Sequence, residues 1–316
     1  MNILFNCSVA NSYQFISIIA AKIKISEKYN SNVFLKIEYH QHWNRKNVSY
    51  KILEMIDAIN YDGEKIKFDK EFNISINNPV LFKKNQIIID DGVGAYRRNP
   101  FLLMSVIDNE NAFKNGVKTS IFFKIKFLIK FFIKILISLC YKRNLSIFQK
   151  RTFKYFDVEH ENKLYFIKSI DYICNFLSIN YSLIYENVIV YLSQPYSLIG
   201  FQGEDEYMRF MISMIDFFKK NNENCILLIK KHPVDNFDYK KIDALLLDDD
   251  MPAEIYFYKN NKAIKKIVGF NSTSLLTGKI LFDIPSFYIE WNNKLRLSGD
   301  CFLDKCFVKH LELLKI

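Results

Sequence analysis

Short apolar runs of strand length alternate along the chain with longer segments in which apolar side chains recur at helical spacing. The strand-like runs are residues 2–7, 33–37, 86–89, 188–192, 225–229 and 266–268. The clearest helical segments are residues 12–23, 50–59 and 207–219. This alternation is typical of α/β proteins with mainly parallel sheets.

The length of the chain fits two domains of this kind. It has 316 residues, of which 50% are hydrophobic and 25% charged, a balance that excludes both a disordered protein and a multispanning membrane protein. We therefore predict two Rossmann-like domains, residues 1–165 and 166–316.

The net charge of +10 is concentrated in the first half of the chain. Residues 1–160 contain 25 Lys and Arg against 14 Asp and Glu, whereas the remainder contains 19 against 20. Basic surfaces usually contact nucleic acid, anionic membrane or anionic substrates. The aromatic residues lie within apolar runs and no nucleic-acid-binding motif is present, so nucleic acid is the weakest of these alternatives.

Residues 121–143 form a basic amphipathic helical segment. Lys126, Lys130 and Lys134 share one helical face, and Phe, Ile and Leu cover most of the remaining circumference. Four lysines make a membrane-spanning helix improbable. The segment either lies on an anionic membrane surface, inserts into a partner, or packs in the core with its lysines reaching outward.

The cysteines and the N-terminus indicate the compartment. The six cysteines show no C-x-x-C spacing, and the first residues lack the features of a signal peptide. We expect free thiols and a cytoplasmic protein, peripheral on the inner face of the bacterial cytoplasmic membrane if the basic helix binds lipid.

Ligands of parallel α/β sheets bind beyond the carboxyl ends of the strands, so the residues that follow each run are candidates for the functional site. The run at 86–89 is followed by Asp90, Asp91 and Gly92. A carboxylate at the mouth of a cleft can act as a general base. For this motif alone, a solvated Asp-Gly turn is the favoured interpretation.

The run at 225–229 leads into Lys230, Lys231, His232 and Pro233. The proline restricts His232 to extended conformations and ends strand pairing. A histidine held beside two lysines suits a phosphate, to which it can donate a hydrogen bond or a proton. A His-Pro pair by itself is more often a structural turn.

The run at 266–268 leads into a polar cluster at the start of an apolar helical segment. The cluster is Asn271, Ser272, Thr273 and Ser274. One of these side chains is expected to cap the helix. The hydroxyls and the backbone amides of the helix N-terminus together also form an anion-binding site.

In this order, the motifs resemble those of bacterial sialyltransferases, specifically the lipooligosaccharide sialyltransferases of glycosyltransferase family 52 and the related capsular polysialyltransferases. The D/E-D/E-G motif of these families matches residues 90–92, their HP motif matches residues 232–233, and their Ser/Thr motif matches residues 272–274. Gln194, in the sequence YLSQP, resembles the start of their nucleotide-binding domain.

The resemblance implies a fold of the GT-B type, in which the two Rossmann-like domains face each other across a cleft. The acceptor would bind to the N-terminal domain and the donor to the C-terminal domain. It implies a metal-independent, inverting transfer of sialic acid from a CMP donor to a cell-surface glycan such as lipooligosaccharide or capsule. No cofactor or metal is implied, and homo-oligomers are compatible with it. Asp91 would be the catalytic base, and Asp90 and Gly92 would support its loop. His232 would contact the CMP phosphate and assist its departure.

The remaining donor-binding residues implied by the resemblance are Gln194, Pro233, Asn271, Ser272, Thr273 and Ser274. Two alternatives stay open: a GT-B transferase that uses CMP-Kdo or another nucleotide sugar, and, less favoured, a nucleic-acid-binding protein.

Overall fold

The structure is a computed structural model. It describes residues 1–9, 11–39, 48–63, 66–76, 85–89, 101, 104, 108, 119–140, 160–179, 185–197, 199–221, 224–247, 251–292, 294–295 and 301–316.

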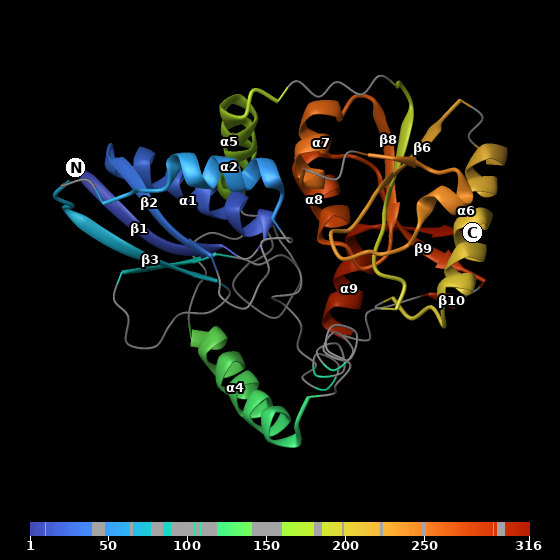
Figure 1. Ribbon diagram of the computed structural model, residues 1–316, viewed down its shortest axis with the longest axis horizontal. Coiled ribbons are helices and arrows are strands. Elements are labelled where there is room, and N and C mark those ends of the chain that lie inside the picture. Colours follow the sequence, from blue (N-terminus) through green and yellow to red (C-terminus); the bar gives the residue numbers. More distant parts are fainter. Residues whose placement is uncertain are drawn as a thin grey trace.

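The N-terminal half forms a parallel sheet in the order β2-β1-β3-β4. Its strands are β1 (Asn2–Val9), β2 (Asn32–Tyr39), β3 (Lys70–Ile76) and β4 (Gln86–Ile89). Helices α1 (Ser12–Tyr29) and α2 (Tyr50–Ile59) cover one side of it (Figure 1). The run Phe15–Ala21 of α1 is almost completely buried, because it packs on the sheet on one side and on a later helix on the other.

The C-terminal half forms a second sheet in the order β10-β9-β8-β5-β6-β7, with β11 beside β9. All of its pairings are parallel except that of β10 with β9. The strands are β5 (Val188–Leu192), β6 (Ile226–Lys230), β7 (Leu245–Leu246), β8 (Ile264–Gly269), β9 (Ser286–Trp291), β10 (Lys294–Leu295) and β11 (Glu312–Lys315).

Helices lie on both sides of this second sheet. They are α6 (Glu204–Asn221), α7 (Ala253–Asn260), α8 (Thr273–Phe282) and α9 (Cys301–His310), with a short 3-10 helix at Tyr239–Ile242. In Figure 1, α7 and α8 lie on the side that faces the N-terminal domain and α6 lies on the far side. Every residue of β5 is buried, as expected for a central strand covered on both faces. Gly278 lets α8 approach closely, since a Cβ there would lie 2.4 Å from the Ile267 side chain.

The predicted α/β fold of the GT-B type is therefore confirmed, as two Rossmann-like domains face each other. Each strand-like run predicted from the pattern lies in a strand of the structure, within one or two residues at the ends. Among the elements that the prediction missed are β3, although its Phe72, Ile74 and Ile76 alternate with polar residues, and β9 and the helix α7, whose apolar residues follow no clean period.

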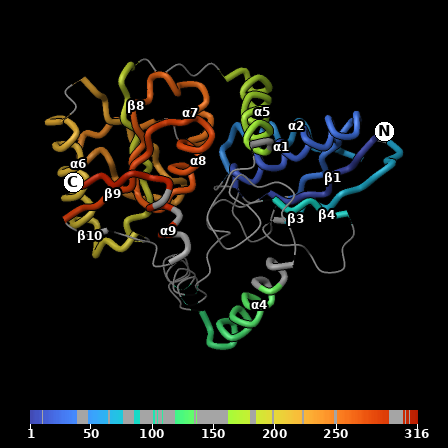
Figure 2. Tube along the Cα trace, turned by 180° about the vertical axis from the view of Figure 1, so that it is seen from behind, coloured from blue at the N-terminus to red at the C-terminus, as the bar shows by residue number. Residues whose placement is uncertain are grey.

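Helix α5 (His160–Phe176) joins the two domains. Its Lys168 pairs with Glu27 of α1 at 2.6 Å, and its Asp171 accepts a hydrogen bond from Tyr258 of α7 at 2.9 Å. Figure 2 shows α5 standing between α1 and α7. The domain boundary predicted between residues 165 and 166 falls inside this continuous helix.

Helix α4 (Ile121–Cys140), which contains most of the segment 121–143, stands apart from both sheets (Figures 1 and 2). Of its side chains that the structure describes, only Phe131 is buried. The interpretation of this segment as a core helix is therefore wrong. No helix within the described ranges is long and apolar enough to cross a membrane.

Candidate active site

A cavity of about 770 Å³ lies between the two domains, where the carboxyl ends of the central strands meet. Each sheet contains a point where two neighbouring strands are connected to strands on opposite sides. In the first sheet β1 leads to β2 on one side and β3 leads to β4 on the other, and in the second sheet β5 leads to β6 on one side and β8 leads to β9 on the other. Ligands of open α/β sheets bind at such switch points. Residues that follow β1, β5, β6 and β8 line the cavity, which is therefore the candidate active site.

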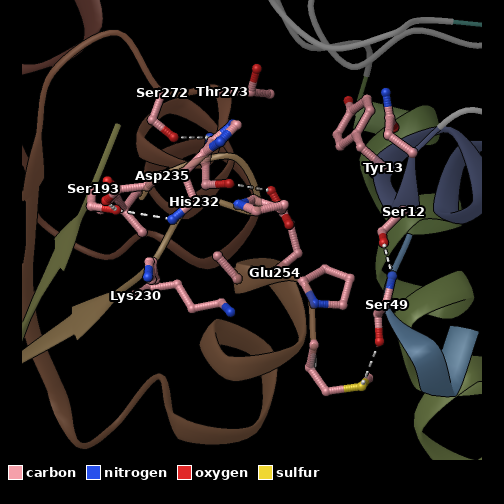
Figure 3. A pocket seen from close by; sticks show the side chains of 18 of the residues that line it. Ser12, Tyr13, Ser49, Ser193, Lys230, His232, Asp235, Glu254, Ser272 and Thr273 are labelled. Carbon is pink, nitrogen blue, oxygen red and sulfur yellow. Dashed lines mark hydrogen bonds between the residues drawn. The ribbon is translucent and has the colours of Figure 1, made fainter. Parts of the chain in front are cut away.

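Histidine 232 lies at the end of β6 and lines the cavity (Figure 3). Its backbone N–H donates to Ser193 Oγ at 2.9 Å, and its Nδ1 accepts from the backbone N–H of Val234 at 3.3 Å. Because Nδ1 is an acceptor, the neutral ring carries its proton on Nε2. Burial, reinforced by the charge of Lys230 and opposed by that of Asp235, lowers the pKa of His232 to about 4. At neutral pH this histidine is an uncharged hydrogen-bond donor.

A buried chain of hydroxyls and one carboxylate fixes the loop that carries His232. Asp235 Oδ2 accepts from Ser193 Oγ and from Tyr239 Oη, both at 2.6 Å, and Oδ1 accepts from the backbone N–H of Phe237 at 3.0 Å. The chain continues through Tyr207 Oη, 3.0 Å from Tyr239 Oη. Burial raises the pKa of Tyr239 far above its ordinary value, which keeps its hydroxyl a donor to Asp235. Because Ser193 Oγ also accepts the hydrogen bond from the backbone N–H of His232, this network extends from the interior of the domain to the cleft.

The N-terminus of α8 points into the same cavity. Ser272 caps the helix, since its Oγ accepts from the backbone N–H of Ser274 at 3.3 Å. Ser274 Oγ donates to Glu254 at 2.9 Å, and Thr277 donates to the same carboxylate oxygen at 2.9 Å. A capping serine that accepts still has its own hydroxyl hydrogen to donate. Ser272 can therefore cap the helix and contact an anion at once, whereas Ser274 is held by Glu254.

The other predicted donor-binding residues line this cavity as well. Gln194 follows β5, and Pro233 and Thr273 lie beside His232 and Ser272 along the wall. Asn271 is held by Tyr288, whose hydroxyl donates to its Oδ1 at 2.7 Å. The structure thus brings Gln194, His232, Pro233, Asn271, Ser272, Thr273 and Ser274 together in one place.

The N-terminal domain contributes a different surface to the cavity. Asn11 caps α1, because its Oδ1 accepts from the backbone N–H of Gln14 at 2.8 Å. Ser12 Oγ accepts from the backbone N–H of Ser49 at 3.2 Å, and Ser49 Oγ donates to the sulfur of Met251 across the cleft at 3.7 Å. Figure 3 shows Ser12, Tyr13 and Ser49 opposite His232 and Ser272.

The predicted base and its supporting loop, Asp90, Asp91 and Gly92, lie outside the described residues. The strand before them, β4, is parallel to β1, and its carboxyl end is at the same edge of the sheet. The carboxylates of the described part that line the cavity, Asp235 and Glu254, each accept hydrogen bonds from two hydroxyls. Within the described residues, no three His, Cys, Asp or Glu side chains are grouped closely enough to hold a metal ion.

Sequence reasoning missed the supporting residues Ser193, Asp235, Tyr239 and Glu254. A signal existed for two of them: Ser193 is the first residue after the run 188–192, and Asp235 follows His-Pro by two residues. Nothing in the sequence indicates that Tyr239 or Glu254 face the same site, because they reach it from a 3-10 helix and from α7.

Comparison with solved structures finds proteins whose backbone trace is similar over most of the chain, at low sequence identity. The GT-B domain of a sialyltransferase from Photobacterium damselae is 10% identical, with 100% of both chains covered and a TM-score of 0.42. A 2,6-sialyltransferase from Vibrionaceae Photobacterium sp. JT-ISH-224, in a ternary complex with CMP and lactose, is 12% identical over 99% of this chain and 78% of that one, with a TM-score of 0.41. A putative UDP-N-acetylglucosamine 2-epimerase from Listeria monocytogenes is 8% identical over 100% and 84%, with a TM-score of 0.47.

No protein of curated function matches the sequence. Residues 5–290 match the alpha-2,8-polysialyltransferase family (POLYST), a range that includes both walls of the cavity and all three motifs. This match confirms the resemblance to bacterial polysialyltransferases that the motifs indicated. The chain belongs to the alpha-2,8-polysialyltransferase family and is a glycosyltransferase of the sialyltransferase class.

Proposed function

We propose that this sialyltransferase takes sialic acid from a CMP donor and transfers it, with inversion and without a metal, to a glycan acceptor such as capsule or lipooligosaccharide. The observation that carries the proposal is the set of uncharged donors, His232, Ser272 and the N-terminus of α8, that converge on one wall of the cavity. Such a set suits a phosphate.

The donor wall is adapted to a leaving group that needs no proton. A phosphate monoester has its second pKa near 6, so CMP departs as an anion at neutral pH. What it requires is stabilisation of the charge that grows as the bond between the sugar C2 and the phosphate oxygen breaks. The Nε2–H of His232 and the hydroxyl of Ser272 supply that stabilisation as fixed hydrogen bonds, with the positive end of the α8 dipole behind them.

The acceptor side supplies the other half of the reaction. The acceptor hydroxyl oxygen attacks C2 from the face opposite the phosphate, and its proton passes to the base. Asp91 is the base in this proposal. The cleft carboxylates of the C-terminal domain, Asp235 and Glu254, are hydrogen-bonded to hydroxyls of their own wall. Strand β4, which directly precedes residues 90–91 in the sequence, ends at the edge of the N-terminal sheet that faces the cleft, and this supports the choice of Asp91.

The proposal is tested with the purified protein and a panel of donors. CMP should raise the melting temperature more than UMP or GMP, because a ligand that binds only the folded state stabilises it. CMP-sialic acid should be hydrolysed slowly without any acceptor, and EDTA should leave this rate unchanged. Faster hydrolysis of CMP-Kdo or of a UDP-sugar, or loss of hydrolysis in EDTA, would contradict the assigned donor chemistry.

A further inference from the structure

Helix α4 exposes a continuous strip of large apolar side chains. Seven of them are between 46% and 78% exposed, and at 100° per residue they fall within an arc of about 120°. This apolar strip is Ile121, Phe122, Ile125, Ile129, Phe132, Ile133 and Leu136. Single exposed apolar residues are ordinary, but a strip along a helix marks a surface that something covers.

The opposite side of α4 attaches the helix to the protein. Phe131 is buried, and Lys124 forms an ion pair with Asp108 at 2.5 Å. Lys124 and Phe131 are seven residues apart and share a face, about 180° from Phe122 and Ile129. The apolar strip therefore points away from the contacts that hold the helix in place.

Lysines border the apolar strip on one side. Lys126 and Lys130 are exposed, and the sequence of α4 contains no Asp or Glu. A surface with apolar side chains in one arc and lysines beside it matches a lipid interface, where the apolar groups enter the acyl region and the lysines reach the headgroup phosphates. A second copy of the chain would bring the same lysines toward each other, and like charges oppose that contact.

We infer that α4 binds the surface of an anionic lipid bilayer through the apolar strip, with Lys126 and Lys130 at the headgroups. The helix lies in the plane of the interface rather than across it. The inference goes beyond the proposed function, because it uses no residue of the cavity and stands whichever sugar the enzyme transfers.

The inference is tested by flotation of the 316-residue protein with vesicles of phosphatidylcholine, with and without phosphatidylglycerol. The protein should float with the anionic vesicles and much less with the neutral ones, and salt should weaken the binding. The double variant Phe122→Ser with Ile129→Ser should bind about 100-fold more weakly, since each buried apolar side chain accounts for roughly tenfold. The double variant Lys126→Glu with Lys130→Glu should lose at least about 30-fold on anionic vesicles, since each lysine accounts for roughly fivefold.

Matched controls are Ile212→Ser and the pair Lys219→Glu with Lys220→Glu, which change exposed residues of α6 in the other domain. These variants should float like the wild type, and all variants should keep the same CMP-induced shift in melting temperature. Absence of wild-type binding to anionic vesicles, or unchanged binding by both α4 variants, would overturn the inference. So would a wild-type dimer that Phe122→Ser with Ile129→Ser converts to a monomer, because the apolar strip would then be an interface between copies.

Discussion

The two walls of the cleft are built in different ways. The C-terminal wall rests on a buried network in which Asp235 accepts hydrogen bonds from two hydroxyls and a backbone N–H. One of these hydroxyls belongs to Ser193, which in turn accepts the backbone N–H of His232, so the network fixes the position of both residues. The N-terminal wall presents a capped helix end and the short contact of Ser12 with Ser49.

This difference fits the demands of the two substrates in the proposed reaction. A phosphate whose charge changes during the reaction requires donors that do not reorganise, and a buried network provides them. In the proposed reaction the acceptor enters and leaves along the N-terminal wall, and residues 1–160 carry the basic excess of the sequence. The two walls should therefore respond differently to substitution.

The largest effect is expected from the base on the acceptor side. Asp91→Ala should lower the rate of transfer about 10²- to 10⁴-fold, the usual contribution of a general base, and should leave CMP affinity within about twofold. The measurement is transfer from CMP-sialic acid beside a titration of CMP by calorimetry. Glu54→Ala, an exposed carboxylate of α2, is the control. Full transfer by Asp91→Ala would remove this residue from the base role.

On the donor side, His232→Ala should weaken CMP binding and turnover together, by about 10- to 100-fold, because a hydrogen bond to a charged group is lost. Glutamine can present an N–H close to the position of Nε2, so His232→Gln should recover part of the loss. Equal activity of the Ala and Gln variants would show that the imidazole does more than donate one hydrogen bond.

A residue of this site can be predicted from the sequence only if the residues near it in the chain form a recognisable pattern, such as an apolar run of strand length. His232 and Ser272 lie three and four residues after apolar runs, so the rule that ligands bind at strand ends located both of them. Tyr239 and Glu254 are buried and reach the site through tertiary packing, which no local pattern in the sequence marks. For α4, the pattern predicted an amphipathic helix but did not show what contacts its apolar side. The spacing of apolar residues is the same whether a helix packs in the protein core, on a partner or on a membrane surface.

The buried network gives the third prediction. In Asp235→Asn, one of the two carboxylate oxygens becomes an NH₂ group, which donates hydrogen bonds instead of accepting them. The remaining oxygen cannot serve both the two hydroxyls and the backbone N–H of Phe237. A buried group left without its partner costs about 1–3 kcal/mol. Unfolding by urea should show this loss, and CMP should bind roughly tenfold more weakly because His232 loses its support. Tyr239→Phe, which removes a single donor, should cost less in both measurements; a larger cost for Tyr239→Phe would contradict the central place of Asp235.

A smaller effect separates the two roles of Ser272. Ser272→Ala removes both the cap and the phosphate donor, and should cost about 1 kcal/mol of stability together with some CMP affinity. Ser272→Asp restores the cap but places a carboxylate where the phosphate would lie. It should therefore be as stable as the wild type and bind CMP more weakly than Ser272→Ala does. Tight CMP binding by Ser272→Asp would place the phosphate elsewhere in the cavity.

The last prediction tests the donor wall through pH. The pKa of His232 is about 4 in the folded protein, below the ordinary value of 6.5 that applies to the unfolded chain. Between these values the unfolded chain binds more protons, so the contribution of His232 to stability is present above pH 6.5 and is lost as the pH falls toward 4. From pH 7 to 5, the melting temperature of the wild type should therefore fall more than that of His232→Gln. CMP places an anion beside the ring, which favours the charged imidazole, and should reduce the difference between the two proteins. Parallel pH profiles for wild type and variant would mean that His232 is not held in its neutral form.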